Sequence, residues 1–145
     1  MDEDRLSNIC YFIDERGNKP VEEFIRALVT KERAKVFAYL SELKREGSNL
    51  HRPMADYLGS GIYELRPKTN RIFYFFYLRD TAVLVHAIKK YTKKIPENDL
   101  RLCIKRKTQI EEGYGRIENL IFWGGLYEKN WKGKIGKYWD TSKRR

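Results

Sequence analysis

The segment that most constrains the fold of this chain runs from Ile62 to Thr92, IYELRPKTNRIFYFFYLRDTAVLVHAIKKYT. It contains three apolar, strand-like runs that are separated by short polar breaks. Cationic side chains stand at its turns and ends, at Arg66, Lys68, Arg71, Lys89 and Lys90. Apolar runs joined by such short turns predict a twisted antiparallel sheet, and here the rim of that sheet carries positive charge.

The three runs differ in how many of their faces are apolar. Residues 62–68 have one polar face, which is typical of a strand with a solvated outer side. That polar face carries Glu64, Arg66 and Lys68. Residues 71–78 and 81–88 are apolar on both faces, which predicts central strands. One face of the last run carries Leu84, His86 and Ile88.

A first strand and two helices are predicted before this segment. Residues 8–13 (NICYFI) form a short apolar run, and Pro20 fits the first position of a helix, where its missing N–H costs nothing. The apolar face of that helix carries Val21, Phe24, Ile25 and Leu28. After a break at Thr30, which we expect to cap the next helix, residues 31–46 predict a second helix that ends at Gly47. The two helices would form a hairpin over one face of the sheet.

The remaining segments of this part are a loop and a third helix. Residues 48–61, with Pro53 and two glycines, read as a loop, and His51 on it is more typical of solvated surface than of catalysis. Pro96 opens the third helix, whose apolar stripe is formed by Leu100, Cys103 and Ile104. Its basic flank, which we interpret as a solvated face, carries Lys105, Arg106 and Lys107.

The element order β-α-α-β-β-β-α predicts an α+β fold with a mainly antiparallel sheet over residues 1–112. From residue 113 the composition changes, because residues 113–145 hold six of the ten glycines and all three tryptophans. The tryptophans stand eight residues apart, at Trp123, Trp131 and Trp139. We interpret residues 113–145 as a basic Gly/Trp-rich C-terminal extension of unknown role. A second nucleic-acid surface is one alternative for it, because aromatic side chains among lysines suit stacking on bases.

The net charge of +10 is unevenly distributed. Residues 1–60 hold 10 Lys/Arg and 11 Asp/Glu, whereas residues 61–145 hold 20 and 9. A neutral first part joined to a basic second part indicates a polyanion partner, and RNA is the candidate that we favour. A basic surface that serves solubility is the alternative.

Several other classes of protein are disfavoured by the sequence. The two cysteines, Cys10 and Cys103, lack metal-ligand spacing and are too few for a disulfide framework, so we expect them to be small buried hydrophobes. The N-terminus has no apolar signal core, and no run approaches the ~18 apolar residues that span a bilayer. We expect a cytoplasmic protein with no membrane partner, no metal and no cofactor.

RNA can be cleaved without a metal when its 2′-OH attacks the adjacent phosphorus. This reaction needs a base, an acid for the leaving oxygen and cations on the phosphate oxygens. Arg66 and Arg71 are candidates for the phosphate, because a guanidinium fork fits its oxygens, although Arg66 can instead pair with Glu64. His86 is a candidate base or acid, with a satisfied core histidine as the alternative. Lys89 completes the candidate catalytic set.

Further cations and aromatic rings near these residues are candidates for RNA binding. They are Lys68, Tyr74, Lys90, Tyr91, Lys93 and Lys94. The lysines would add positive field, and the tyrosines can stack on a base or donate a proton. The alternative for each lysine is a solvated strand end.

The motifs IYELRPK, RIFYFFY and VLVHAIKKYTKKIP, in this element order, resemble the RelE/ParE toxin superfamily, and within it the phage-derived branch close to HigB. The resemblance covers about residues 5–112 and is most specific at 62–96. It implies the toxin of a type II toxin–antitoxin pair, an endoribonuclease that cleaves mRNA on the ribosome. It also implies a cognate antitoxin, often of the helix-turn-helix type. Within the resemblance, the arginines of E-L-R and R-I-F-Y, Arg66 and Arg71, match functional positions.

Two alternatives remain open. A ParE-like toxin of the same fold would inhibit DNA gyrase without nuclease chemistry. A non-catalytic RNA-binding module would use the same basic face.

Overall fold

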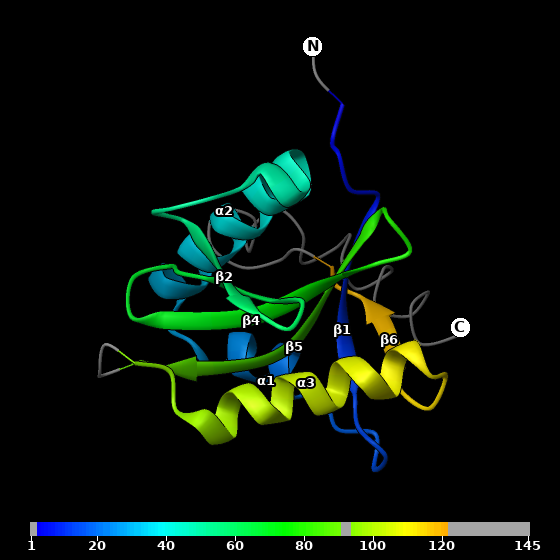
Figure 1. Ribbon diagram of the computed structural model, residues 1–145. Helices are drawn as coiled ribbons and strands as arrows, with labels where there is room; N and C mark the ends of the chain where they lie inside the picture. The colour runs from blue at the N-terminus through cyan, green and yellow to red at the C-terminus, as the bar shows by residue number, and fades with distance from the viewer. Residues whose placement is uncertain (1–2, 91–93, 122–145) are drawn as a thin grey trace, which may run out of the picture.

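The computed structural model describes residues 3–90 and 94–121 as a six-stranded sheet with helices on both faces (Figure 1). In chain order the elements are β1 (Asn8–Ile13), α1 (Pro20–Ala27), α2 (Thr30–Glu46), the 3-10 helix η1 (Gly47–Asn49), β2 (Ala55–Gly59), β3 (Ile62–Leu65), β4 (Asn70–Tyr77), β5 (Thr81–Lys89), α3 (Glu97–Glu111) and β6 (Arg116–Asn119). The strand order is β2-β3-β4-β5-β1-β6, and only the β1–β5 pair is parallel. The predicted α+β class and mainly antiparallel sheet are therefore confirmed.

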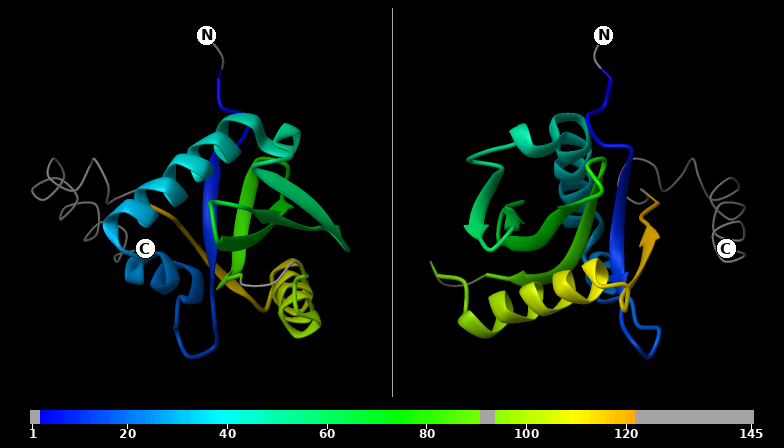
Figure 2. Two further views of the ribbon diagram at one scale, coloured as in Figure 1. Left: turned by 90° about the vertical axis from the view of Figure 1, so that its left-hand side faces the viewer. Right: turned by 45° about the vertical axis from the view of Figure 1, so that its right-hand side comes forward.

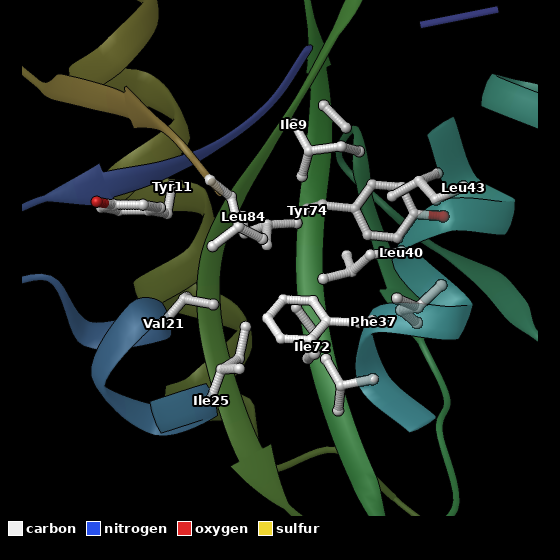
Figure 3. Packing of buried hydrophobic residues seen from close by; sticks show 14 of the residues in the cluster. Ile9, Tyr11, Val21, Ile25, Phe37, Leu40, Leu43, Ile72, Tyr74 and Leu84 are labelled. Carbon is white, nitrogen blue, oxygen red and sulfur yellow. The ribbon is translucent and has the colours of Figure 1, made fainter. Parts of the chain in front are cut away.

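Helices cover both faces of the sheet, so the chain has two apolar cores, one on each face. The predicted hairpin of α1 and α2 packs on one face, and α3 packs on the other, as the left view of Figure 2 shows. Figure 3 shows the core beneath the hairpin, where Tyr74 of β4 packs beside Leu40 and Leu43 of α2. The core beneath α3 is centred on Phe73, Phe75 and Cys103, each fully buried. Because β4 contributes to both cores, it is the central strand that its two apolar faces predict.

Local sequence signals set the helix ends. Pro20 is the first residue of α1, and Glu22 and Glu23 follow in its first turn, where acidic side chains suit the helix dipole. Gly47 ends α2 with φ of +58°, a backbone conformation that other residues adopt only with strain. Thr30 is the first residue of α2 rather than its cap, since Val29 occupies the cap position and no side chain bonds there.

Two strands lie where no strand was predicted. β2 lies inside the predicted loop 48–61 and pairs with β3 through the tight turn at Gly59–Gly61. The flanking proline and glycines gave this segment the composition of a loop. β6 pairs with β1 at the opposite edge and places residues 116–119 in the main sheet. The three tryptophans of the predicted extension lie outside the described residues.

A β-bulge in β5 corrects the predicted surroundings of His86. Phe73 pairs with His86, but the next residue of β4, Tyr74, pairs with Leu84, so Val85 is an extra residue in β5. The bulge breaks the alternation of side chains. Leu84 therefore packs under the α1–α2 hairpin, whereas His86 faces the α3 side with Phe73. The prediction that His86 shares a face with Leu84 was wrong for this reason.

No helix in the described part of the chain is both long and apolar enough to cross a membrane.

Candidate functional site

An open groove of about 640 Å³ lies at the end of the sheet where β3 turns into β4. Its walls come from β2, β3, the β3–β4 turn, the end of β5 and the first turn of α3. Its volume falls in the range of small-ligand sites, about 300–1,000 Å³. Among the described residues the groove has six cationic side chains: Arg52, Arg66, Lys68, Arg71, Lys90 and Lys94. Two acidic side chains, Asp56 and Glu64, line it as well, so the groove attracts anions overall.

Arginine and acidic side chains alternate from the rim of the groove to its floor. Arg52 donates to Asp56 at 2.8 Å, and Asp56 lies 4.0 Å from Arg66. Arg66 in turn donates to Glu64 at 3.3 Å, and the other oxygen of Glu64 lies 3.8 Å from Nε of Arg71. We call these five residues the groove network. The groove network fixes the directions of three guanidinium groups, each of which ends a long side chain that would otherwise be mobile.

Arg71 is the most buried cation of the groove network, with 11% of its side chain exposed. Its Nη1 donates to the backbone carbonyls of Lys68 at 2.6 Å and Asn70 at 2.8 Å. These bonds tie the guanidinium to the β3–β4 turn, where Lys68 has φ of +59°. Burial lowers the pKa of Arg71, because desolvation disfavours its charge, and Glu64 acts in the opposite direction. Arginine nevertheless stays protonated at any physiological pH.

Glu64 was predicted on a solvated outer face, and that prediction was wrong. Its side chain is 3% exposed, because Asp56 and Phe73 flank it on the neighbouring strands and Arg66 and Arg71 approach its two oxygens. The salt bridge between Arg66 and Glu64 that the sequence left open is present. Arg66 remains 30% exposed and lines the groove, so pairing with Glu64 does not remove it from the site.

At the rim, Asp56 and Arg52 shift each other's titration. The hydrogen bond from Arg52 lowers the pKa of Asp56, and the same bond raises the pKa of Arg52. Both effects favour the ionised pair.

His86 does not line the groove; in the sheet, Phe73 lies between it and Glu64 of the groove. Its Nε2 is 2.7 Å from Oδ1 of Asp99 in the first turn of α3, and its ring stacks on Phe73 with centroids 5.8 Å apart. The side chain is 16% exposed. Leu100, the neighbour of Asp99, lines the groove. A histidine oriented by a carboxylate is an arrangement that serves proton transfer, and it equally satisfies a half-buried ring.

Arg106 of α3 holds the bulge that turns His86 toward Asp99. Its Nη1 donates to the carbonyl of Val85 at 2.7 Å, and its guanidinium lies 4.9 Å from the ring centroid of Phe12. The predicted solvated flank of α3 was therefore wrong for Arg106, which is half-buried, and fits only the exposed Lys105. Burial lowers the pKa of Arg106.

The structure brings five of the predicted site residues together in the groove: Arg66, Lys68, Arg71, Lys90 and Lys94. Lys89 points to the opposite face, where its ammonium donates to Glu32 at 2.6 Å and to Asn70 at 3.0 Å. Tyr74 is fully buried in the core beneath α2, so its ring is inaccessible to a base. Tyr91 and Lys93 lie outside the described residues.

Four residues of this region were missed from the sequence: Arg52, Asp56, Glu64 and Asp99. Arg52 and Asp56 fell in the predicted loop, and the five residues of β2, ADYLG, carry no alternation that would reveal a strand there. Asp99 stands in the first turn of the predicted third helix, where an acidic residue is expected from the helix dipole alone. His51 is exposed, with Nδ1 2.8 Å from the carbonyl of Asn49, and lies outside the groove lining.

No three histidine, cysteine, aspartate or glutamate side chains within residues 3–90 and 94–121 come together in a way that would hold a metal ion.

Comparison with known families gives a match over more than half of the chain. The family described as "Phage derived protein Gp49-like (DUF891)" matches residues 23–108, which include α2, the strands β2–β5 and most of α3. No curated protein matches the chain. The matched range contains all the described residues of the groove.

Proposed function

The chain belongs to the family of phage-derived Gp49-like proteins, and from this membership we propose that it is the toxin of a type II toxin–antitoxin pair that cleaves mRNA. Proteins of this family are RelE- and HigB-like, which agrees with the resemblance of the E-L-R and R-I-F-Y motifs. The observation that carries the proposal is a groove lined by six cationic side chains, of which Arg66 and Arg71 are held in place at the floor by hydrogen bonds.

The groove supports binding of a polyanion strand. Lys68, Lys90 and Lys94 supply positive field along its walls, which would draw in an RNA backbone and make binding sensitive to salt. Arg66 and Arg71 present planar guanidinium groups at the floor, where bidentate contacts to one phosphate are possible. A surface that served solubility alone would not need arginines held in place by a buried acid, Glu64.

The cleavage proposed here is transesterification within the RNA strand. The 2′-OH loses its proton, its oxygen bonds to the adjacent phosphorus, and the bond from phosphorus to the 5′-oxygen breaks. The 5′-oxygen takes up a proton, and the products are a 2′,3′-cyclic phosphate and a 5′-hydroxyl. Arg66 and Arg71 would stabilise the extra negative charge on the phosphorane.

His86 is the proposed proton-transfer group, because its ring is oriented by Asp99, which precedes Leu100 of the groove wall. If His86 acts in catalysis, His86→Ala lowers the cleavage rate and leaves the melting temperature nearly unchanged. If it serves packing alone, stability and activity fall together. We omit Lys89 and Tyr74 from the proposed site because neither faces the groove.

The experiment that tests the function is incubation of the purified chain with mRNA, with and without ribosomes. Cleavage in either arm supports the nuclease. Binding without cleavage would identify an RNA-binding module, and inhibition of DNA gyrase with intact mRNA would identify a ParE-like toxin. Expression without a partner should arrest growth and deplete mRNA. A small protein encoded next to this chain is the proposed antitoxin, and co-expression with it should restore growth.

A further inference from the structure

The buried carboxylate of Glu64 is out of place in a groove that binds a polyanion. It lies on the floor of the groove, 3% exposed, and its charge repels a phosphate in the same space. A buried carboxylate is also costly to the fold unless cations compensate it. The cations around Glu64 provide this compensation.

Glu64 is the acid that Arg66 and Arg71 of the groove network share. One oxygen accepts from Arg66 at 3.3 Å, and the other lies 3.8 Å from Nε of Arg71. The charge of Glu64 also acts on Arg52. Since β3 lies between β2 and β4, its side chain can reach arginines that enter the groove from both sides.

The pairing between Glu64 and Arg71 leaves unused hydrogen-bonding capacity. Both Oε1 of Glu64 and Nε of Arg71 are buried and have no hydrogen-bond partner within the described residues. The guanidinium is instead tied by Nη1 to the carbonyls of Lys68 and Asn70. The turn therefore holds one edge of Arg71, and the carboxylate electrostatically holds its Nε edge.

We propose that Glu64 is a positioning residue of this site, whose buried carboxylate aligns Arg66 and Arg71 for one phosphate group of the bound RNA. This inference rests on the proposed function. The carboxylate acts through the arginines and does not itself touch the substrate. The negative charge of Glu64 weakens the overall attraction of the groove to RNA. The same charge holds the guanidinium groups of Arg66 and Arg71 in one geometry.

The test compares Glu64→Gln with a matched control, Glu22→Gln. Glu22 is also buried, at 6% exposure, and also pairs with an arginine, Arg26, but it lies on α1. Each variant exchanges a buried carboxylate for an amide of nearly equal volume. Both variants should lose stability because each removes the charge of a buried acid that pairs with an arginine. Only Glu64→Gln should affect the groove.

We expect Glu64→Gln to lower kcat about 10- to 100-fold, the size of loss that follows a misplacement of about 1 Å in a catalytic arrangement. Affinity for a non-cleavable 2′-deoxy oligonucleotide should stay within about threefold, because the six groove cations remain and dominate binding. Glu22→Gln should keep the wild-type kcat. A wild-type kcat in Glu64→Gln, or an equal loss in Glu22→Gln, would overturn the proposal.

A second readout does not depend on cleavage. The side-chain N–H signals of Arg66 and Arg71 in NMR spectra should shift in Glu64→Gln and stay unchanged in Glu22→Gln. If the wild-type chain cleaves no RNA, the proposed nuclease fails, and these signals alone decide whether Glu64 positions the arginines. Unchanged signals in Glu64→Gln would refute the positioning role.

If Glu64→Gln does not fold, Glu64→Asp takes its place. Glu64→Asp keeps the charge and withdraws the carboxylate by one methylene group. Its melting temperature should stay close to that of the wild type, and its kcat should fall by a smaller factor than that expected for Glu64→Gln. A well-folded Glu64→Asp protein with the wild-type kcat contradicts the proposal.

Discussion

Replacing Arg71 by alanine should damage both the site and the fold. The sequence places Arg71 at the start of a strand with its head at a solvated rim, a position from which its loss would scarcely affect folding. The structure instead buries most of its side chain and gives Nη1 two backbone acceptors, at 2.6 and 2.8 Å. Arg71→Ala therefore also removes two charge-assisted hydrogen bonds and one of the cations near Glu64.

The two effects have separate magnitudes. Hydrogen bonds to charged groups contribute roughly 1.5–3 kcal/mol each at most, and the partial exposure of the turn reduces this, so we expect a loss of about 2–4 kcal/mol in the free energy of unfolding. If Arg71 stabilises the phosphorane, the barrier rises by about 2–4 kcal/mol, which is ~10²–10³ in rate. Arg71→Lys should recover only part of the rate, because an ammonium cannot replace the bidentate fork.

Urea unfolding and single-turnover cleavage, measured on the same protein at a temperature where it is fully folded, separate the two effects. Arg79→Ala is the control, because Arg79 is an exposed arginine in the β4–β5 turn, at the end of β4 opposite the groove. It removes the same charge and should change neither measurement. An Arg71→Ala protein with the wild-type unfolding midpoint would refute the burial argument. Cleavage at the wild-type rate would remove Arg71 from the site.

Three further predictions concern the rest of the fold. Burial raises the pKa of Cys10 to about 11 and that of Cys103 to about 12, so neither thiol should react with a disulfide reagent at pH 8 until the protein unfolds, and fast labelling of the native protein would contradict this. Arg52 lowers the pKa of Asp56 in the folded state, so the ion pair stabilises the fold above the unfolded pKa of about 3.9, and this stabilisation is lost as the pH falls from there through the lower folded pKa. In thermal melts between pH 5 and pH 3, the melting temperature of Asp56→Asn should therefore fall less than that of the wild type. Leu40 is fully buried in the core beneath α2, so Leu40→Ala should cost about 2–5 kcal/mol in urea unfolding, and a loss under 1 kcal/mol would mean that this core relaxes around the cavity.

The predictions that succeeded depended on local signals. Pro20 starts a helix and Gly47 ends one because each residue restricts or extends the backbone conformations available at its own position. The apolar runs at 71–78 and 81–88 became β4 and β5 because a strand that is apolar on both faces needs a core on each side. Such signals need no knowledge of what packs against them.

The predictions that failed depended on distant partners. The polar alternation of 62–68 gave no sign that β2 would pair beside β3 and help to bury Glu64, because β2 has the composition of a loop. The bulge at Val85 is held by Arg106, 21 residues later in the chain, and strict alternation of side chains along β5 cannot reveal it. A one-residue slip of this kind changes the face of every side chain on one side of it, which is why His86 was given the wrong neighbour.

Lys89 and Lys90 show why a count of basic residues overestimates the charge at the site. They are adjacent in sequence, but Lys89 at the end of β5 turns to Glu32 on α2, where it lowers the pKa of that carboxyl group, and Lys90 faces the groove. Alternation along a strand divides any cluster of cations between two faces, so only part of the +10 net charge can act on one ligand. Within the groove, Asp56 and Glu64 offset the cations further. Fixed guanidinium geometry, more than total charge, therefore distinguishes this groove from an ordinary basic surface.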